Sequence, residues 1–240
     1  MYREKKILAF IGARKGSKGL KNKNTLKFAG KPLINWTIQA SLASKHVDHT
    51  LVSTYGENIA RIARAAVADA PFLRPAPLAS DRALIEGAVR HALDWLKENK
   101  KIDFDYVLLL QPTSPLRTAQ DIDDAIIYYF RHCQTPADTL VSVKKAPVKT
   151  GWLMEENPKG YIDFCFDIQG QKHRRQNLPS HYLPNGLIFF APTEVILRER
   201  FYSSRMLPFI MDEDISVDID DKEDFKHALK IFSQRVAPIN

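Results

Sequence analysis

Apolar and polar positions change along the chain in a pattern that predicts strands alternating with helices. Short apolar runs that stop abruptly at glycine, proline or polar residues are typical of strands buried in a parallel sheet. They occur at residues 6–11, 49–54, 106–110, 139–143 and 187–190. Residues 209–211 are a candidate for one further short strand.

Helices are predicted where apolar residues recur every three or four positions between these runs. The matching segments are residues 32–42, 58–68, 85–96, 119–130 and 221–232. Pro32 suits the first turn of its helix, and Asp220 or Asp221 lies near the N-terminus of the last one. The alternation predicts an α/β domain in which helices cover both faces of a mostly parallel sheet.

The pattern breaks at about residue 147. Residues 147–186 hold alternating aromatic and polar segments, prolines and glycines, with no convincing helix. We interpret this stretch as an inserted β-rich lobe, and residues 1–146 and 187–240 as one domain.

The length and composition of the chain fit one large domain. The chain has 240 residues, of which 45% are hydrophobic, and no apolar run is long enough to span a bilayer. The N-terminus shows no signal-peptide pattern, so a cytoplasmic protein without a membrane partner is expected. Cys133 and Cys165 share no metal-ligand spacing and are expected to be reduced thiols.

The net charge of +7 and the pI of about 9.3 suggest a nucleic-acid partner, but the charge distribution does not. Residues 1–31 contain ten Lys or Arg and one acid, whereas residues 212–224 contain eight acids and one Lys. The basic cluster lies in a glycine loop without the interleaved aromatic residues of a nucleic-acid surface. Solvated surface charge remains an alternative, but the two clusters suit a polyphosphate with its metal ion.

A glycine- and lysine-rich segment at residues 12–24 follows the first predicted strand directly. Glycine lets backbone N–H groups turn toward an anion, and the cations neutralise its charge. The segment is neither a Walker A loop nor a dinucleotide-binding G-x-G-x-x-G. On its own it could equally be an ordinary surface loop.

A second motif, residues 109–117, continues past the carboxyl end of a central predicted strand, where open α/β sheets bind ligands. Its two prolines also fit a rigid turn with no further role. Gln111 favours a site, because an amide at a buried strand end needs hydrogen-bond partners.

The third motif places Asp218 and Asp220 two residues apart on an extended segment, so both carboxylates point the same way. Their repulsion is relieved by a cation, and Mg²⁺ prefers one or two carboxylates together with phosphates. Capping of the last helix is the alternative role, and it suits Asp220 better than Asp218.

Taken in order, these motifs resemble the acylneuraminate cytidylyltransferases, the CMP-sialic acid synthetases. The resemblance rests on Ala-Arg-x-Gly-Ser-Lys-Gly, Lys-Asn, Leu-Arg-Pro-Ala-x-Leu-Ala-Ser-Asp, Leu-Leu-Gln-Pro-Thr-Ser-Pro-Leu-Arg, Arg-Gln-x-Leu-Pro, Pro-Asn-Gly and Asp-Ile-Asp. It implies a Rossmann-like nucleotidyltransferase domain and a protruding lobe that forms a homodimer.

The resemblance also implies the roles of individual residues. The nucleotide site would comprise Ala13, Arg14, Ser17 and Lys23 at the CTP phosphates and Asn24, Arg74, Ala79, Ser80 and Asp81 at the cytidine. The sugar site would comprise Gln111, Asn185 and, from the lobe, Lys149 and Arg175. Asp218 and Asp220 would bind Mg²⁺.

The implied reaction is attack of the sugar's anomeric hydroxyl on the α-phosphorus of CTP, with pyrophosphate leaving. Catalysis would consist mainly of positioning and charge neutralisation, with Arg14, Lys23, Asp218 and Asp220 as the catalytic groups. The sequence does not identify the group that takes the hydroxyl proton.

Two departures from the family pattern affect the expected ligand contacts. Residues 82–85 read Arg-Ala-Leu-Ile where the family typically has Thr-Ala-Ser-Ser, so hydroxyls that would serve ribose or base contacts are lost. Leu183 stands where the family usually has Arg before Pro-Asn-Gly, which removes one cation from the sugar side. The alternative acceptor to N-acetylneuraminate is therefore legionaminic or pseudaminic acid, whose deoxygenated, diacylated tails suit a less polar pocket. A catalytically inactive nucleotide-binding protein is the alternative of another class.

Overall fold

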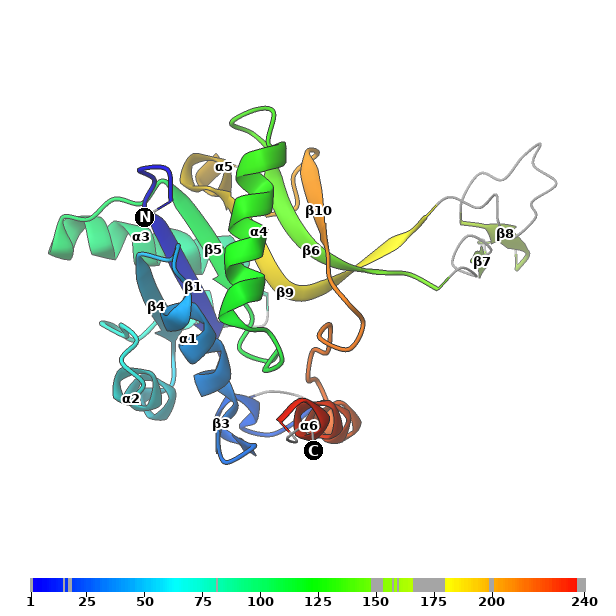
Figure 1. Cartoon of the computed structure of the whole chain (residues 1–240), viewed down its shortest axis with the longest axis horizontal. Coiled ribbons are helices and arrows are strands. Elements are labelled where there is room, and N and C mark those ends of the chain that lie inside the picture. Colours follow the sequence, from blue (N-terminus) through cyan, green and yellow to red (C-terminus); the bar gives the residue numbers. More distant parts are fainter. Residues whose placement is uncertain are drawn as a thin grey trace.

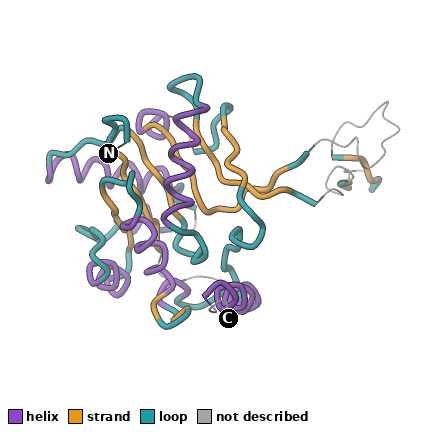
Figure 2. The backbone as a smooth tube through the Cα atoms, viewed as in Figure 1, coloured by secondary structure: helices purple, strands orange, loops and turns teal. Residues whose placement is uncertain are grey.

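The computed structural model describes residues 2–14, 16, 19–80, 82–147, 153–156, 158, 160–165, 180–198 and 201–236. A six-stranded sheet forms its centre, in the order β10-β6-β9-β5-β1-β4 (Figures 1 and 2). The strands are β1 (Ile7–Ala13), β4 (His49–Thr54), β5 (Tyr106–Leu110), β6 (Thr139–Lys145), β9 (Tyr182–Pro192) and β10 (Met206–Ile210). The prediction of an α/β domain with a mostly parallel sheet is confirmed, since β9 runs antiparallel to both of its neighbours and the other pairs are parallel.

Side chains alternate between the two faces of β1 and define two layers of core. Ile7, Ala9 and Ile11 face one core, to which α1 (Leu33–Ala43), α2 (Glu57–Ala65) and α4 (Ala119–His132) contribute. Leu8 and Phe10 face the other, which α3 (Ile85–Lys100) and α5 (Thr193–Arg198) complete. Helices therefore cover both faces of the sheet, as the sequence predicts.

A third core fixes α6 (Lys222–Val236) beside the segment that follows β1. That segment contains the 3-10 helix η1 (Lys23–Thr25) and the short strands β2 (Lys27–Phe28) and β3 (Lys31–Pro32). The rings of Phe225 and Phe232 on α6 each lie 5.6 Å from the ring of Phe28, and Phe232 also contacts Trp36. This aromatic cluster holds the C-terminal helix against the start of α1.

Beyond the sheet, β6 and β9 continue together as a two-stranded arm. The arm leads toward a separate hairpin of β7 (Met154–Glu156) and β8 (Ile162–Phe164), at the right of Figure 1. Within the arm, β9 begins at Tyr182, inside the stretch that the sequence assigns to the lobe. The division of the chain at residues 147 and 186 stays a prediction. Among the described residues, no helix is long and apolar enough to cross a membrane.

The pairing of β6 with β9 is irregular where the arm leaves the sheet. Val141 pairs with Phe189, but Val143 pairs with Pro184, so the register shifts between these positions. The extra residues lie on β9 and include Asn185 and Gly186, and the φ angle of Gly186 is +74°. A glycine with positive φ is typical of a bulge, which bends a strand and redirects its side chains.

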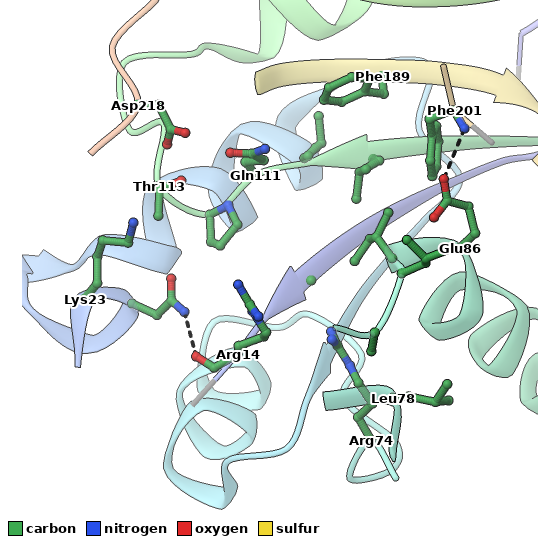
Figure 3. A pocket seen from close by; sticks show the side chains of 18 of the residues that line it. Arg14, Lys23, Arg74, Leu78, Glu86, Gln111, Thr113, Phe189, Phe201 and Asp218 are labelled. Atoms are coloured by element: carbon green, nitrogen blue, oxygen red, sulfur yellow. Dashed lines mark hydrogen bonds between the residues drawn. The ribbon is translucent and has the colours of Figure 1, made fainter. Parts of the chain in front are cut away.

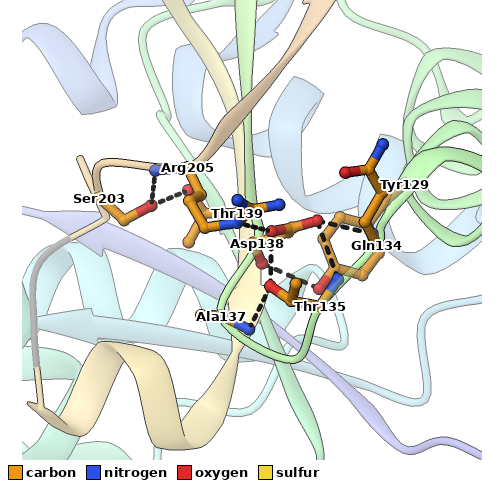
Figure 4. A network of polar contacts seen from close by, with 8 residues as sticks. All are labelled: Tyr129, Gln134, Thr135, Ala137, Asp138, Thr139, Ser203 and Arg205. Carbon is orange, nitrogen blue, oxygen red and sulfur yellow. Dashed lines mark hydrogen bonds and ion pairs between the residues drawn. The ribbon is translucent and has the colours of Figure 1, made fainter.

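A buried carboxylate, Asp138, anchors the beginning of β6 and β10 at the opposite end of the sheet (Figure 4). It accepts hydrogen bonds from the backbone N–H of Gln134 at 2.6 Å, from the hydroxyl of Thr135 at 2.7 Å and from Nε of Arg205 at 2.6 Å. The bond from Arg205 is the largest of the causes that hold the pKa of Asp138 well below its usual range, and the backbone N–H groups add to it.

Because its pKa is lower in the folded than in the unfolded chain, Asp138 stabilises the fold fully above the unfolded pKa of about 4 and progressively less as the pH falls below it. We expect Asp138→Asn to lower the free energy of unfolding by about 1–3 kcal/mol at pH 7 in urea denaturation. The difference from wild type should shrink below about pH 4. The exposed Asp94→Asn serves as the control, and equal effects of the two substitutions would contradict this account.

Candidate functional site

A cavity of about 720 Å³ opens at the carboxyl ends of β1 and β5 (Figure 3). Its polar lining comes mainly from the three motifs of the sequence, which are far apart along the chain, and Arg74 adds a cation from a fourth segment. The residues involved are Arg14, Lys23, Asn24, Arg74, Gln111, Thr113, Asp218 and Asp220. Since parallel strands present their carboxyl ends at one edge of the sheet, the loops that follow them meet there.

The segment from the last motif closes onto the glycine loop. Lys23, whose side chain is only 11% exposed, forms an ion pair with Asp220 at 2.8 Å. A Cβ atom on Gly19 would lie 2.5 Å from the backbone oxygen of Asp220, so only glycine permits this approach. The backbone N–H of Ile219 donates to the carbonyl of Thr113 at 3.0 Å and ties the same segment to the end of β5.

Asp218 is partly buried, and burial raises the pKa of its carboxyl group. The nearby negative charge of Asp220 adds to this, while a hydrogen bond from Thr113 opposes it. Its Oδ1 atom is buried without a hydrogen-bond partner among the described residues. A carboxylate oxygen in this condition is stabilised by a cation, so the residues fit the oxygen-seeking Mg²⁺. Among the described residues no group of three or more His, Cys, Asp or Glu could hold a metal ion, so further ligands would come from phosphate or water.

Asn24 is 6% exposed, and its side chain supports the glycine loop. Its amide nitrogen donates to the carbonyl of Arg14 at 3.2 Å, whereas its Oδ1 is buried without a partner among the described residues. Both residues line the cavity, so this amide fixes the backbone beside the Arg14 guanidinium.

Arg74 is a buried cation, and only 3% of its surface is exposed. It donates to the hydroxyl of Ser53 at 3.0 Å and to the Ser53 carbonyl at 2.5 Å. Burial, with a smaller effect of the positive charge of Arg14, lowers the pKa of Arg74 to about 10, so the group stays charged at neutral pH. A buried guanidinium that bonds to neutral groups favours an anionic or strongly polar ligand in the adjoining space.

The other predicted site residues are placed differently. Ala13 ends β1 in the core beside the cavity. Ala79 ends the 3-10 helix η2 (Ala76–Ala79) and Ser80 is exposed just after it, and neither lines the cavity, whereas Leu78 does. Ser17, Asp81, Lys149 and Arg175 lie outside the described residues.

Asn185 is buried at the bulge of β9 rather than on the cavity wall. Its Oδ1 accepts from the hydroxyl of Ser142 at 2.5 Å, and its amide nitrogen donates to the hydroxyl of Ser216 at 2.9 Å. It links β6, β9 and the start of the Asp218 segment. A role in sugar binding stays a prediction, and the observed contacts give Asn185 a supporting position.

The half of the cavity beyond Gln111 is largely apolar, which the sequence did not indicate. Its wall contains Ile85, Phe189, Phe201 and Tyr202, together with one acid, Glu86. The carboxylate of Glu86 accepts a hydrogen bond from the backbone N–H of Phe201 at 3.3 Å and joins α3 to this wall (Figure 3). No motif marks these residues. The one nearby signal was the departure from the family pattern at residues 82–85, which include Ile85.

A mostly parallel sheet with cations and acids gathered at its carboxyl edge is typical of α/β enzymes that bind phosphorylated ligands. The family model described as Cytidylyltransferase matches residues 8–236. The chain therefore belongs to the cytidylyltransferase family, and the resemblance drawn from the motifs is confirmed.

Curated relatives point to the same family. The chain is 36% identical over 227 residues to an N-acylneuraminate cytidylyltransferase of Escherichia coli, with 94% of this chain and 52% of the relative covered. It is 35% identical to a CMP-N,N'-diacetyllegionaminic acid synthase of Legionella pneumophila, covering 90% of this chain and 91% of the relative. Identity to a pseudaminic acid cytidylyltransferase of Campylobacter jejuni is 30%, over 93% of this chain and 94% of the relative. The chain thus spans about half the length of the N-acylneuraminate relative.

The fold is also similar to that of a solved structure. A CMP:2-keto-3-deoxy-manno-octonic acid synthetase complexed with CTP superimposes with a TM-score of 0.69 at 14% identity, over 96% of this chain and all of that one. At this identity the likeness concerns the fold alone.

The close approach of Gly19 to the Asp220 backbone gives a direct test of how the site closes. We expect Gly19→Ala to lower the free energy of unfolding by about 1–3 kcal/mol, because backbone atoms cannot move aside as a flexible side chain can. Gly87→Ala, within helix α3, is the matched control. A Cβ at residue 87 would meet only the tip of the Leu78 side chain, at 3.2 Å. Chemical denaturation measures both variants, and a Gly19→Ala protein as stable as wild type would contradict the closure.

Proposed function

We propose that this chain transfers CMP from CTP to the anomeric hydroxyl of a nine-carbon 2-keto acid sugar and releases pyrophosphate. One observation carries the proposal. A single cavity combines the cations Arg14, Lys23 and Arg74, the acids Asp218 and Asp220, and an amide at the end of β5. Such a site suits a nucleoside triphosphate at one end and a polar acceptor at the other.

On the nucleotide side, Arg14 and Lys23 would contact the phosphates and Arg74 the cytidine. The phosphates carry most of the negative charge of CTP, and the glycine loop allows backbone N–H groups to approach them. Arg74 is held rigidly by Ser53 and lies at the edge near Leu78, away from Lys23 (Figure 3). These separate positions in one cavity support binding of the phosphates near Lys23 and of the cytidine near Arg74.

Mg²⁺ is part of the proposal, with Asp218 and Asp220 as its protein ligands. When bound, the ion would neutralise charge on the phosphate oxygens. In the structure Asp220 is already paired with Lys23. Coordination of Mg²⁺ by Asp220 would break this ion pair, and Lys23 could then contact the phosphates.

The proposed reaction is a single displacement at phosphorus. The bond from the anomeric oxygen to the α-phosphorus forms, the bond from the α-phosphorus to the bridging oxygen of pyrophosphate breaks, and the hydroxyl proton is released. Arg14 and Lys23 offset the charge that grows on the leaving pyrophosphate. Gln111 holds the acceptor so that its oxygen lies in line with the leaving group.

The apolar wall supports an acceptor with a less polar tail, such as legionaminic or pseudaminic acid. Phe189, Phe201, Tyr202 and Ile85 would pack against acyl and deoxygenated groups more readily than against a chain of hydroxyls. Leu183 does not contribute to this wall, because it lies on the arm, 42% exposed. The names of the relatives include an N-acylneuraminate cytidylyltransferase, a legionaminic acid synthase and a pseudaminic acid cytidylyltransferase, so they support the nonulosonate class and leave the choice within it to the apolar wall.

A homodimer through the hairpin is the proposed assembly. The described part of β7, β8 and their flanks exposes Leu153, Met154, Tyr161, Ile162 and Phe164. A two-stranded hairpin is marginally stable alone, and such a patch favours burial against a second copy. A cytoplasmic location, where CTP is available, belongs to the same proposal.

The reaction is tested by supplying the protein with CTP, Mg²⁺ and each of N-acetylneuraminate, legionaminic acid and pseudaminic acid, while pyrophosphate release is measured. We expect turnover with a preference for the two less polar sugars. Preference for N-acetylneuraminate would reject the acceptor assignment, and no pyrophosphate with any sugar would reject the transfer reaction.

In the same assay, Asp218→Asn and Asp220→Asn should each lower kcat by about 100-fold or more, because each removes a charge from the proposed metal site. The matched control is Asp214→Asn, an exposed carboxylate on the turn before this segment, which should leave kcat within about twofold of wild type. Equal losses in all three variants would indicate a general effect on the segment instead.

The dimer is tested by placing a charge in the exposed patch. We expect Ile162→Asp to shift the protein from dimer to monomer in sedimentation velocity, since a buried charge without a partner costs several kcal/mol. Val67→Asp, at an apolar side chain that is 81% exposed on the main domain, is the control. A wild-type protein that sediments as a monomer would contradict the proposed assembly.

A further inference from the structure

The side-chain amide of Gln111 lies flat against the backbone of Gly186 on the neighbouring strand β9. A Cβ atom on Gly186 would lie 3.0 Å from Oε1 and 3.1 Å from both Cδ and Nε2 of Gln111. Nearly equal distances to three atoms of one plane place that missing Cβ over the face of the amide. The absence of a side chain at residue 186 is what leaves room for the amide in this orientation.

The conformation of the bulge brings Gly186 to this position. Its φ of +74° belongs to the left-handed region, and the register of β9 against β6 shifts around it. The flanking residues are fixed, since the side chain of Asn185 bonds to Ser142 and Ser216, and the backbone N–H of Ile188 donates to the Ser142 hydroxyl at 2.8 Å. The backbone under the amide therefore forms a rigid support.

The other end of Gln111 is fixed as well. Its backbone carbonyl accepts a hydrogen bond from the hydroxyl of Thr37 at 3.1 Å and one from Nη2 of Arg117 at 3.3 Å. Arg117 is 2% exposed, and its Nη1 donates to the carbonyl of Leu187, next to Gly186, at 2.6 Å. One buried guanidinium thus joins the end of β5 to the strand that supports the amide.

The amide itself is free to bind a ligand. Gln111 lines the cavity, and its side chain has no hydrogen-bond partner among the residues that the structure describes. The backbone carbonyl of Gln111 is held by two hydrogen bonds, one face of the amide lies against Gly186, and the residue borders the cavity.

We infer that Gly186 is a positioning residue that sets the direction of the Gln111 amide for acceptor binding. The inference rests on the proposed transfer reaction and goes beyond it. In this inference the contact between Gly186 on β9 and the Gln111 amide after β5 sets the orientation of the acceptor. Gly186 itself does not touch the substrate. A Cβ at residue 186 pushes the amide toward the cavity and out of line with the acceptor, while the nucleotide half keeps its structure.

The test is a double-mutant cycle of Gly186→Ala and Gln111→Ala, with KM measured separately for the acceptor sugar and for CTP. We expect Gly186→Ala to raise the KM of the acceptor about ten- to thirtyfold and to leave the KM of CTP within about twofold. In the Gln111→Ala background the same substitution should change the KM of the acceptor by less than about twofold, because the group that Gly186 orients is absent.

Backbone strain is controlled by Gly30→Ala. The φ of Gly30 is +90°, and no atom lies within 4 Å of its Cβ position, so this variant carries the strain without the contact. It should lower thermal stability and leave both KM values unchanged. Gly186→Asn is the second test variant, since asparagine brings the same Cβ and tolerates positive φ better than alanine.

Several outcomes would overturn the inference. One is a rise in the KM of the acceptor on Gly186→Ala that is equally large in the wild-type and Gln111→Ala backgrounds. Another is a rise of similar size in the KM of CTP. Independently of activity, a crystal structure of the Gly186→Ala protein should show the Gln111 amide displaced by about half an ångström or more. An unmoved amide refutes the inference even if the transfer reaction holds, whereas a wild type that converts no sugar refutes the transfer reaction alone.

Discussion

The site depends on the packing of residues 215–220 against the loops that follow β1 and β5. Three contacts hold residues 219 and 220 there. They are the hydrogen bond from Ile219 to Thr113, the ion pair of Lys23 with Asp220, and the close approach of Gly19 to the Asp220 backbone. Without this packing the two aspartates would lie apart from the glycine loop. The aromatic cluster around Phe28 supports it, because α6 begins at Lys222, two residues after Asp220, and is held by that cluster.

A second constraint is the burial of positive charge beneath the cavity. Burial lowers the pKa of Arg74 and of Arg117 to about 10 each, so both remain charged at neutral pH. They bond mainly to hydroxyls and backbone carbonyls, which are neutral groups, and Nε of Arg117 is buried without a hydrogen-bond partner among the described residues. A buried cation is costly without an opposite charge nearby. Under the proposed function, an anionic nucleotide in the cavity would offset part of the cost of burying Arg74.

The sequence predicted the elements that depend on local pattern. Each of the five predicted apolar runs became a strand of the central sheet, and the glycine loop, Gln111 and the Asp218 pair meet in one cavity. What it did not predict depends on contacts between distant segments. The antiparallel β9 and its bulge arise from pairing with β5 and β6, and α5 is too short to show a helical period. Glu86, Phe201 and Tyr202 reach the cavity wall only because α3 and the segment before β10 meet on the same face of the sheet.

The central claim is that the anomeric oxygen of a nonulosonate attacks the α-phosphorus of CTP within this cavity. The most direct measurement uses an acceptor that carries ¹⁸O at the anomeric hydroxyl and follows the products by ³¹P NMR. We expect the label in the oxygen that bridges the sugar and the CMP phosphorus, and none in pyrophosphate. Label in pyrophosphate, or a CMP-sugar without label formed from an acceptor that still carries it, would rule out attack by the anomeric oxygen.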